Sequence, residues 1–209
     1  MYYSKQHRHK KQINSIYKFS IIVGILILVL AWPLSFILPV SISFENGLIE
    51  NLQILVLTLG SIYNIKLIWK SIDKQVAYFH IWCAVFMLFM AFRELSWGRV
   101  FYQIDMESSG PVFIAMSDYP WKIEVHIIII ICILFLIIFM LRNLPIMRML
   151  HCRFPILIIF SMLVAMVFSY IGDHGMLVGK LQGQIIEEMG ELAFYVLTCA
   201  LCIYYHMEL

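Results

Sequence analysis

The chain has 209 residues, of which 62% are hydrophobic and 13% are charged. These proportions exclude an ordinary soluble domain, in which about a quarter of the residues are charged, and the length suits one helical bundle rather than two domains. The net charge of +2 conceals an uneven distribution of acids and bases along the chain. We therefore expect an all-α, multi-pass integral membrane protein with no nucleic-acid partner.

Six apolar stretches follow one another along the chain, and each is long enough to cross a hydrocarbon core of about 30 Å as a helix. Lipid cannot satisfy exposed backbone groups, and the stretches lack the alternation of strands, so helices are predicted. Pro33 and Pro39 are expected to kink the first helix. The predicted helices cover residues 19–42, 47–69, 76–97, 123–141, 154–171 and 185–205, within a transmembrane domain over 19–206.

Basic residues gather in alternate connections between these helices, and they predict the orientation of the chain. Of the 15 Lys and Arg residues, all but Arg93, Arg99, Lys122 and Lys180 share the side of the basic N-terminal arm, residues 1–18. The positive-inside rule makes that side cytoplasmic. Both termini are therefore predicted inside, in a plasma membrane of the bacterial inner-membrane type, with the arm resting on anionic lipid of the bilayer.

The longest loop on the outer side is predicted over residues 98–121. Its middle, residues 110–116, is apolar enough to return to the membrane interface, either as a lid over an outer cavity or as a loop resting on lipid. Just before the sixth helix, glycines recur at positions 175, 179 and 183. We expect this glycine segment to be a loop or a short interfacial helix.

Acidic residues show the opposite distribution to the basic ones. All but Asp73 and Glu208 of the 13 acids fall on the outer half of the predicted helices and their outer connections. Ionisable groups inside or at the mouths of membrane helices are costly and usually functional. The outer acids are Glu45, Glu50, Glu94, Asp105, Glu107, Asp118, Glu124, Asp173, Glu187, Glu188 and Glu191.

The sixth predicted helix carries the densest group of these acids. Glu187, Glu188 and Glu191 share a face with Gln184, because residues three, four and seven apart lie on one side of a helix. Such carboxylates repel one another unless a proton, an arginine or a metal neutralises them. Glu187 and Glu188 are alternatively explained as N-terminal residues that interact with the helix dipole, but Glu191 lies a full turn deeper.

Four residues on four different helices are our candidates for catalysis: Glu50, Glu94, His126 and Glu191. They would act as general acids and bases or as metal ligands at the outer end of the bundle. For Glu50, the alternative is a helix cap or a polar contact between helices. The cofactor is unknown. A divalent metal is one option, with His126, His174, Asp173, Glu187 and Glu188 as candidate ligands.

Substrate binding is predicted at Arg93, Arg99, Trp97 and Asn46. The two arginines are the only ones on the outer side, and a guanidinium grips an anionic head group with two parallel hydrogen bonds. The alternative is that they form internal salt bridges that stabilise the bundle.

Three classes of function fit this pattern. The first is an intramembrane hydrolase or transferase that acts on a lipid or lipid-linked substrate. The second is a non-catalytic subunit that binds a protein partner, and the third is a small proton- or cation-coupled transporter. A transporter needs polar groups through the inner half of the bundle, where only Asn64, Thr198 and Cys202 qualify, since His80 is expected to be part of the core.

Overall fold

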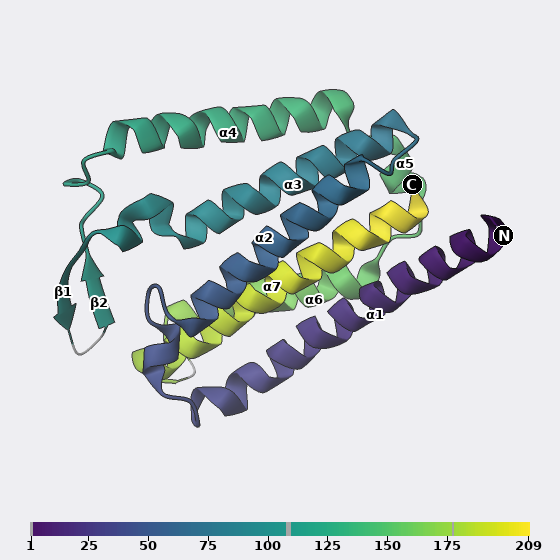
Figure 1. Ribbon diagram of the computed structural model, residues 1–209. Coiled ribbons are helices and arrows are strands. Elements are labelled where there is room, and N and C mark those ends of the chain that lie inside the picture. The colour runs from purple at the N-terminus through teal and green to yellow at the C-terminus, as the bar shows by residue number, and fades with distance from the viewer. Residues whose placement is uncertain (1, 108–109, 177) are drawn as a thin grey trace. The chain divides into compact units, whose positions relative to one another are not determined.

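A computed structural model describes residues 2–107, 110–176 and 178–209, and it is mostly helical (Figure 1). The chain divides into two compact units. Pro39–Ile146 form one, which we call the inserted unit, and Met1–Leu38 with Met147–Leu209 form the other, the terminal unit.

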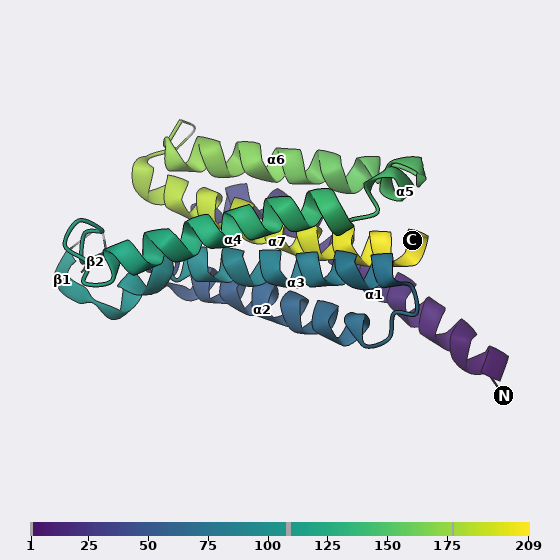
Figure 2. The ribbon, with the colours of Figure 1, turned by 90° about the horizontal axis from the view of Figure 1, so that it is seen from above.

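The inserted unit is built on two antiparallel helices, α2 and α3, that pack along each other, with a third helix, α4, beside α3 (Figure 2). Helix α3 begins at Lys74 because the Asp73 carboxylate accepts the N–H of Gln75 at 2.8 Å, as an N-cap does. The elements of this unit are η1 (Val40–Ser43), α2 (Leu48–Ile68), α3 (Lys74–Glu94), η2 (Ser96–Phe101), β1 (Gln103–Glu107), β2 (Gly110–Phe113) and α4 (Lys122–Asn143).

The predicted outer loop contains a β-hairpin. Strands β1 and β2 pair antiparallel, with Gln103 opposite Phe113 and Glu107 opposite Gly110. Gly110 has φ +127°, and a Cβ there would lie 2.9 Å from the ring of Phe44, so only glycine fits. Backbone pairing between β1 and β2 therefore orders this part of the predicted loop.

The terminal unit is centred on α7, along which both α1 and α6 pack, whereas few contacts join α1 to α6. Its core contains Ile21, Leu28, Ile158, Ala165 and Leu197. The elements of this unit are α1 (Tyr2–Ser35), α5 (Ile146–His151), α6 (Ile156–Asp173) and α7 (Lys180–Glu208).

Glycines bring the backbones of α6 and α7 into close contact. A Cβ on Gly172 would lie 2.5 Å from the backbone nitrogen of Glu187, and one on Gly183 would lie 2.4 Å from the carbonyl oxygen of Gly172. Further along, a Cβ on Gly190 would lie 2.9 Å from the nitrogen of Ser169. Small residues at helix contacts are typical of membrane proteins, where they allow this approach.

Five helical segments in the described part of the chain are long and apolar enough to cross a membrane. The length and apolar composition of these helices indicate that the chain is a membrane protein. The sixth predicted stretch lies in α7, which is not among these segments. The five are Ser15–Ser35, Val40–Ile68, Lys74–Glu94, Lys122–Asn143 and Ile156–Asp173.

Two predicted helix boundaries differ from those in the structure. Helix α7 begins at Lys180, five residues before the predicted start, and so includes part of the glycine segment. Helix α1 ends at Ser35 rather than continuing to residue 42. Pro33 lies inside its last turn, and Pro39 precedes η1, so the chain leaves the helix between the two prolines.

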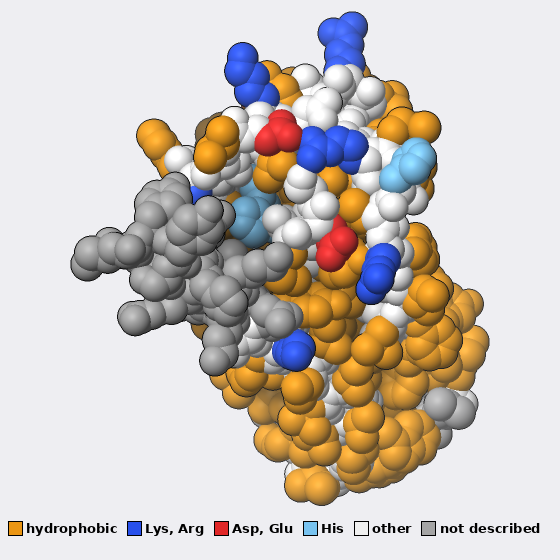
Figure 3. Space-filling model, turned by 90° about the vertical axis from the view of Figure 1, so that its right-hand side faces the viewer, with side chains coloured by type: hydrophobic (Ala, Val, Ile, Leu, Met, Phe, Trp, Pro, Cys, Tyr) orange, Lys and Arg blue, Asp and Glu red, His pale blue; other side chains and the backbone are white. Residues whose placement is uncertain are grey.

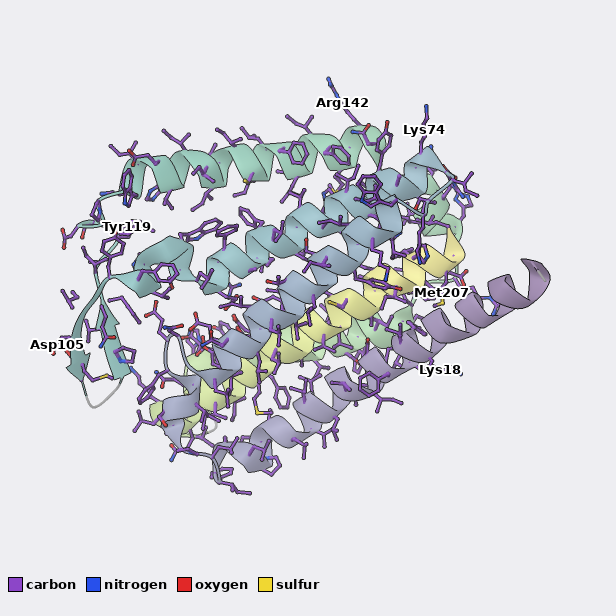
Figure 4. The ribbon with its side chains drawn as sticks, in the orientation of Figure 1. Lys18, Lys74, Asp105, Tyr119, Arg142 and Met207 are labelled. Carbon is purple, nitrogen blue, oxygen red and sulfur yellow. The ribbon has the colours of Figure 1, made fainter. Side chains whose placement is uncertain are left out.

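Charged side chains mark the two ends of the inserted unit. Lys74 and Arg142 lie at the end where α3 begins and α4 ends, and Asp105 lies at the opposite end, with the hairpin (Figure 4). Figure 3 is viewed from the side on which α3 begins and shows Lys and Arg side chains on a surface that also carries Asp, Glu and His side chains. We call the opposite end of the inserted unit, which carries β1 and β2, the hairpin end.

Candidate functional site

Glu94 is the last residue of α3, and its environment at the hairpin end is unfavourable for a carboxylate. Its side chain is 6% exposed, and its Oε1 lies 3.3 Å from Nε of Arg93, whose side chain is 46% exposed. The partial negative charge at a helix C-terminus disfavours an anion, and burial adds a desolvation cost. A carboxylate in such a place needs a charged partner, and Arg93 provides one.

The turn that follows Glu94 has a strained backbone. Ser96, Trp97 and Gly98 have φ values of 44°, 56° and 90°, all in the left-handed region. For a residue with a Cβ this conformation costs roughly 1–2 kcal/mol. Strain of this kind persists only where surrounding contacts impose it, and it is concentrated at functional sites.

Contacts from other segments of the inserted unit hold this turn. Ser96 Oγ donates to Oε1 of Glu45 at 2.7 Å, and the Tyr119 hydroxyl donates to the carbonyl of Trp97 at 3.4 Å. Nε of Arg99 donates to the carbonyl of Ile114 at 2.8 Å. The turn is thus tied to the segments before α2, after β2 and before α4.

Glu50 lies in the first turn of α2, and there its carboxylate accepts the backbone N–H of Asn46. Asn46 itself has φ 62°, and the Asn51 amide donates to the carbonyls of Asn46 at 3.0 Å and Gly47 at 2.7 Å. Glu50 thus makes a local contact at the start of α2, and its side chain is buried. A catalytic role for Glu50 and a binding role for Asn46 stay predictions.

The structure brings several of the predicted residues to one end of the inserted unit. The bond between Ser96 and Glu45 joins the end of α3 to the start of α2, so Glu94 and Glu50 both belong to the hairpin end. Arg93 contacts Glu94 directly. His126 is exposed near the start of α4, where its Nδ1 donates to the carbonyl of Lys122 at 2.6 Å. Its ring is thus oriented by its own helix.

The acids of α7 belong to the terminal unit. Because α7 begins at Lys180, Glu187 and Glu188 lie about two turns inside it, and the interpretation that they cap its N-terminus is wrong. Glu187, Glu188 and Glu191 are half-buried. A meeting of Glu191 with Glu50 and Glu94 stays a prediction.

The metal candidates receive no geometric support. Asp173 and His174 are exposed at the end of α6, where Nδ1 of His174 lies 3.0 Å from the carbonyl of Tyr170 and 3.5 Å from Oδ2 of Asp173. Within residues 2–107, 110–176 and 178–209, no three His, Cys, Asp or Glu side chains are grouped so that they could hold a metal ion.

Sequence reasoning missed a buried polar contact between α2 and α3, far from the hairpin end. Nδ1 of His80 lies 2.8 Å from Oδ1 of Asn64, and Ser61 Oγ donates to the carbonyl of Ala84 at 3.0 Å. Asn64, Ser61 and His80 are all buried. The signal was available, because Asn64 and Ser61 recur with Gln53 on one face of an apolar helix.

Comparison of the chain with protein-family models, curated proteins and solved structures finds no match. The geometry of the described residues is therefore the basis for assigning a function. Its main feature is Glu94, a buried carboxylate at a helix C-terminus, paired with Arg93 and followed by a strained turn.

Proposed function

We propose that the chain is an intramembrane hydrolase or transferase that acts on a lipid or lipid-linked substrate at the outer face of the membrane. The observation that carries this proposal is the environment of Glu94. Its carboxylate is 6% exposed at the C-terminus of α3. A buried carboxylate that Arg93 holds at the end of a helix is in a position to accept a proton during a reaction.

The neighbouring residues supply the other roles in this proposal. Glu94 is the general base, and Arg93 and Arg99 bind an anionic head group, since a guanidinium matches phosphate or carboxylate geometry. Trp97, held in the strained turn, presents an indole near the membrane interface, where this side chain is favoured. Glu50, His126 and Asn46 complete the proposed site within the inserted unit.

A Glu94→Gln variant tests this role, because glutamine keeps the shape of glutamate but cannot accept a proton in the same way. We expect product formation to fall by about 10²–10⁴-fold, the usual contribution of a general acid or base. Wild-type and variant proteins would be placed in vesicles of total bacterial lipid, and lipid species compared by mass spectrometry. Glu124→Gln, which alters an exposed carboxylate on α4, serves as the matched control.

The result that would contradict the proposal is a lipid profile unchanged by wild-type protein, or changed equally by the Glu94→Gln variant. Both proteins must show the same thermal unfolding for this comparison. An unchanged profile would favour the non-catalytic subunit that binds a protein partner.

A specific observation also favours the transporter as a second candidate. Glu50, Gln53, Ser61 and Asn64 are all buried on α2, and His80 extends this polar line on α3. From Glu50 to Asn64 the line is about 21 Å long at 1.5 Å per residue. In this alternative, proton uptake into vesicles should depend on His80, and His80→Phe should abolish it while Glu124→Gln leaves it intact.

For the membrane topology, we propose six spans, with α7 as the sixth, both termini in the cytoplasm and the hairpin outside. A reporter fused after Lys74 or after Arg148 should then be located in the cytoplasm. A reporter fused within the hairpin, after Met106, should be located outside. The basic residues between helices are the physical reason. The reverse pattern at these three positions would place the hairpin end inside and remove the proposed site from the outer leaflet.

A further inference from the structure

An apolar groove lies between α3 and α4 of the inserted unit. It has a volume of about 220 Å³, and every residue that lines it is apolar: Trp82, Phe86 and Phe89 from α3, with Ile, Leu and Met side chains between Ile133 and Met140 of α4. Both helices are among the segments apolar enough to cross a membrane. The groove is therefore surrounded by hydrocarbon rather than water when the protein is in a bilayer.

The contact between α3 and α4 is limited, which is why space remains between them. The indole N–H of Trp82 donates to the carbonyl of Leu136 at 3.0 Å, and the Tyr78 and Phe139 rings are 5.9 Å apart. Within α4, all of which the structure describes, Leu136 is the one buried side chain. In Figure 1 the two helices draw apart toward the hairpin end.

The side chains of α3 that line the groove continue toward the candidate site. Residues 82, 86, 89 and 93 recur at the spacing of one helix face, so Arg93 stands one turn beyond Phe89. The Phe89 ring also contacts the Trp97 ring, with centroids 5.1 Å apart. The groove thus ends beside Arg93 and the strained turn, both of which follow its lining residues along the chain.

The register of α4 adds a second basic residue at this end. Trp82 bonds to Leu136, and the helices run antiparallel. Extending that register by about three turns places Arg93 level with His126. Arg93 is 46% exposed and His126 is exposed, so a head group can reach both side chains.

We infer that this groove holds one hydrocarbon chain of an anionic phospholipid, with its head group at Arg93 and His126. The apolar lining matches the chain, and the arginine matches the charge of the phosphate through charge-assisted hydrogen bonds. The volume is smaller than the ~300–1,000 Å³ of pockets that enclose drug-sized ligands, so it suits a single chain. This inference rests on the proposed function and specifies its substrate class.

Photo-labelling tests the groove directly. The full chain would be reconstituted with phosphatidylglycerol that carries a diazirine on one acyl chain, and labelled peptides would be mapped by mass spectrometry. We expect labelling of the α3 peptide that contains Phe86 and Phe89. Ile137→Trp fills the groove and should lower that labelling about tenfold, the factor that corresponds to ~1.4 kcal/mol. Leu134→Trp adds the same side chain to α4 outside the groove lining and should leave labelling unchanged.

Competition by unlabelled lipids tests the head-group end. Phosphatidylglycerol should compete better than phosphatidylcholine for the wild-type groove, and Arg93→Gln should abolish this preference. Arg142→Gln, which removes an arginine at the opposite end of α4, should keep it. If Ile137→Trp does not fold, as judged by thermal unfolding, Ile133→Trp replaces it as the filling variant.

Three results would overturn the inference. Labelling spread evenly over α4 and unaffected by the filling variant would indicate bulk bilayer lipid. Equal competition by phosphatidylcholine would exclude recognition of an anionic head group. If the filling variant loses a co-purifying protein while its lipid labelling stays unchanged, a partner helix occupies the groove. The Glu94→Gln variant should keep the labelling, so a failure of the proposed chemistry can be told apart from a failure of the groove.

Discussion

Gly172→Ala is expected to destabilise the terminal unit by about 1–3 kcal/mol, as overpacking typically does. The added methyl group would lie 2.5 Å from the backbone nitrogen of Glu187 and 2.6 Å from the carbonyl oxygen of Gly183. Both atoms belong to the backbone of α7 and cannot rotate away, so α6 and α7 would have to separate. Thermal unfolding of the purified protein in detergent measures the loss.

The matched control is Gly179→Ala, just before α7. Its methyl group would meet the flexible Gln182 side chain, with Oε1 at 3.1 Å, and we expect little change in stability. An unchanged melting temperature for Gly172→Ala would contradict the close approach of the two helices.

Asn64→Leu is expected to destabilise the inserted unit by about 1–3 kcal/mol, the cost of disrupting a buried polar contact from one side. The change removes the acceptor that lies 2.8 Å from Nδ1 of His80, in a pair of helices where both side chains are buried. Replacing both partners by apolar residues of similar shape is often nearly neutral. The double variant Asn64→Leu with His80→Phe should therefore recover most of the stability, measured by thermal unfolding of all three variants.

If the double variant is as unstable as the sum of the two single variants, Asn64 and His80 contribute independently. Proton-uptake measurements on the same variants distinguish a structural role of Asn64 and His80 from a role in transport. Recovered stability with lost uptake is the result that favours the transporter.

The long helices followed directly from the apolar stretches, because a segment that crosses lipid must satisfy its backbone groups internally. All six predicted stretches overlap long helices. Helix α7 begins earlier than the predicted stretch, because the glycine segment, expected to be a loop or a short interfacial helix, contributes its second half to this helix. Gly183 is helical, and it packs on Gly172, a contact between residues of two helices that neither local sequence reveals.

The candidate site was predicted only in part. The sequence places Glu94 and Arg93 together because they are neighbours in the chain, and it indicates that acids gather on one side of the membrane. It does not reveal that Ser96 and Trp97 adopt positive φ, since neither is a residue type that favours this conformation. The groove beside α4 also depends on helix packing rather than on any motif.

The order of the two units along the chain has a consequence for synthesis. Helix α1 packs chiefly on α7, yet the whole of the inserted unit and α6 are translated between them. At a synthesis rate of ~5–20 residues per second, α7 leaves the ribosome on the order of 10 s after α1. During that interval the Gly24 side of α1, which will meet Leu197, must be covered by lipid or by the insertion machinery. Slowing translation before Lys180 should therefore expose α1 to membrane proteases for longer, without changing the final structure.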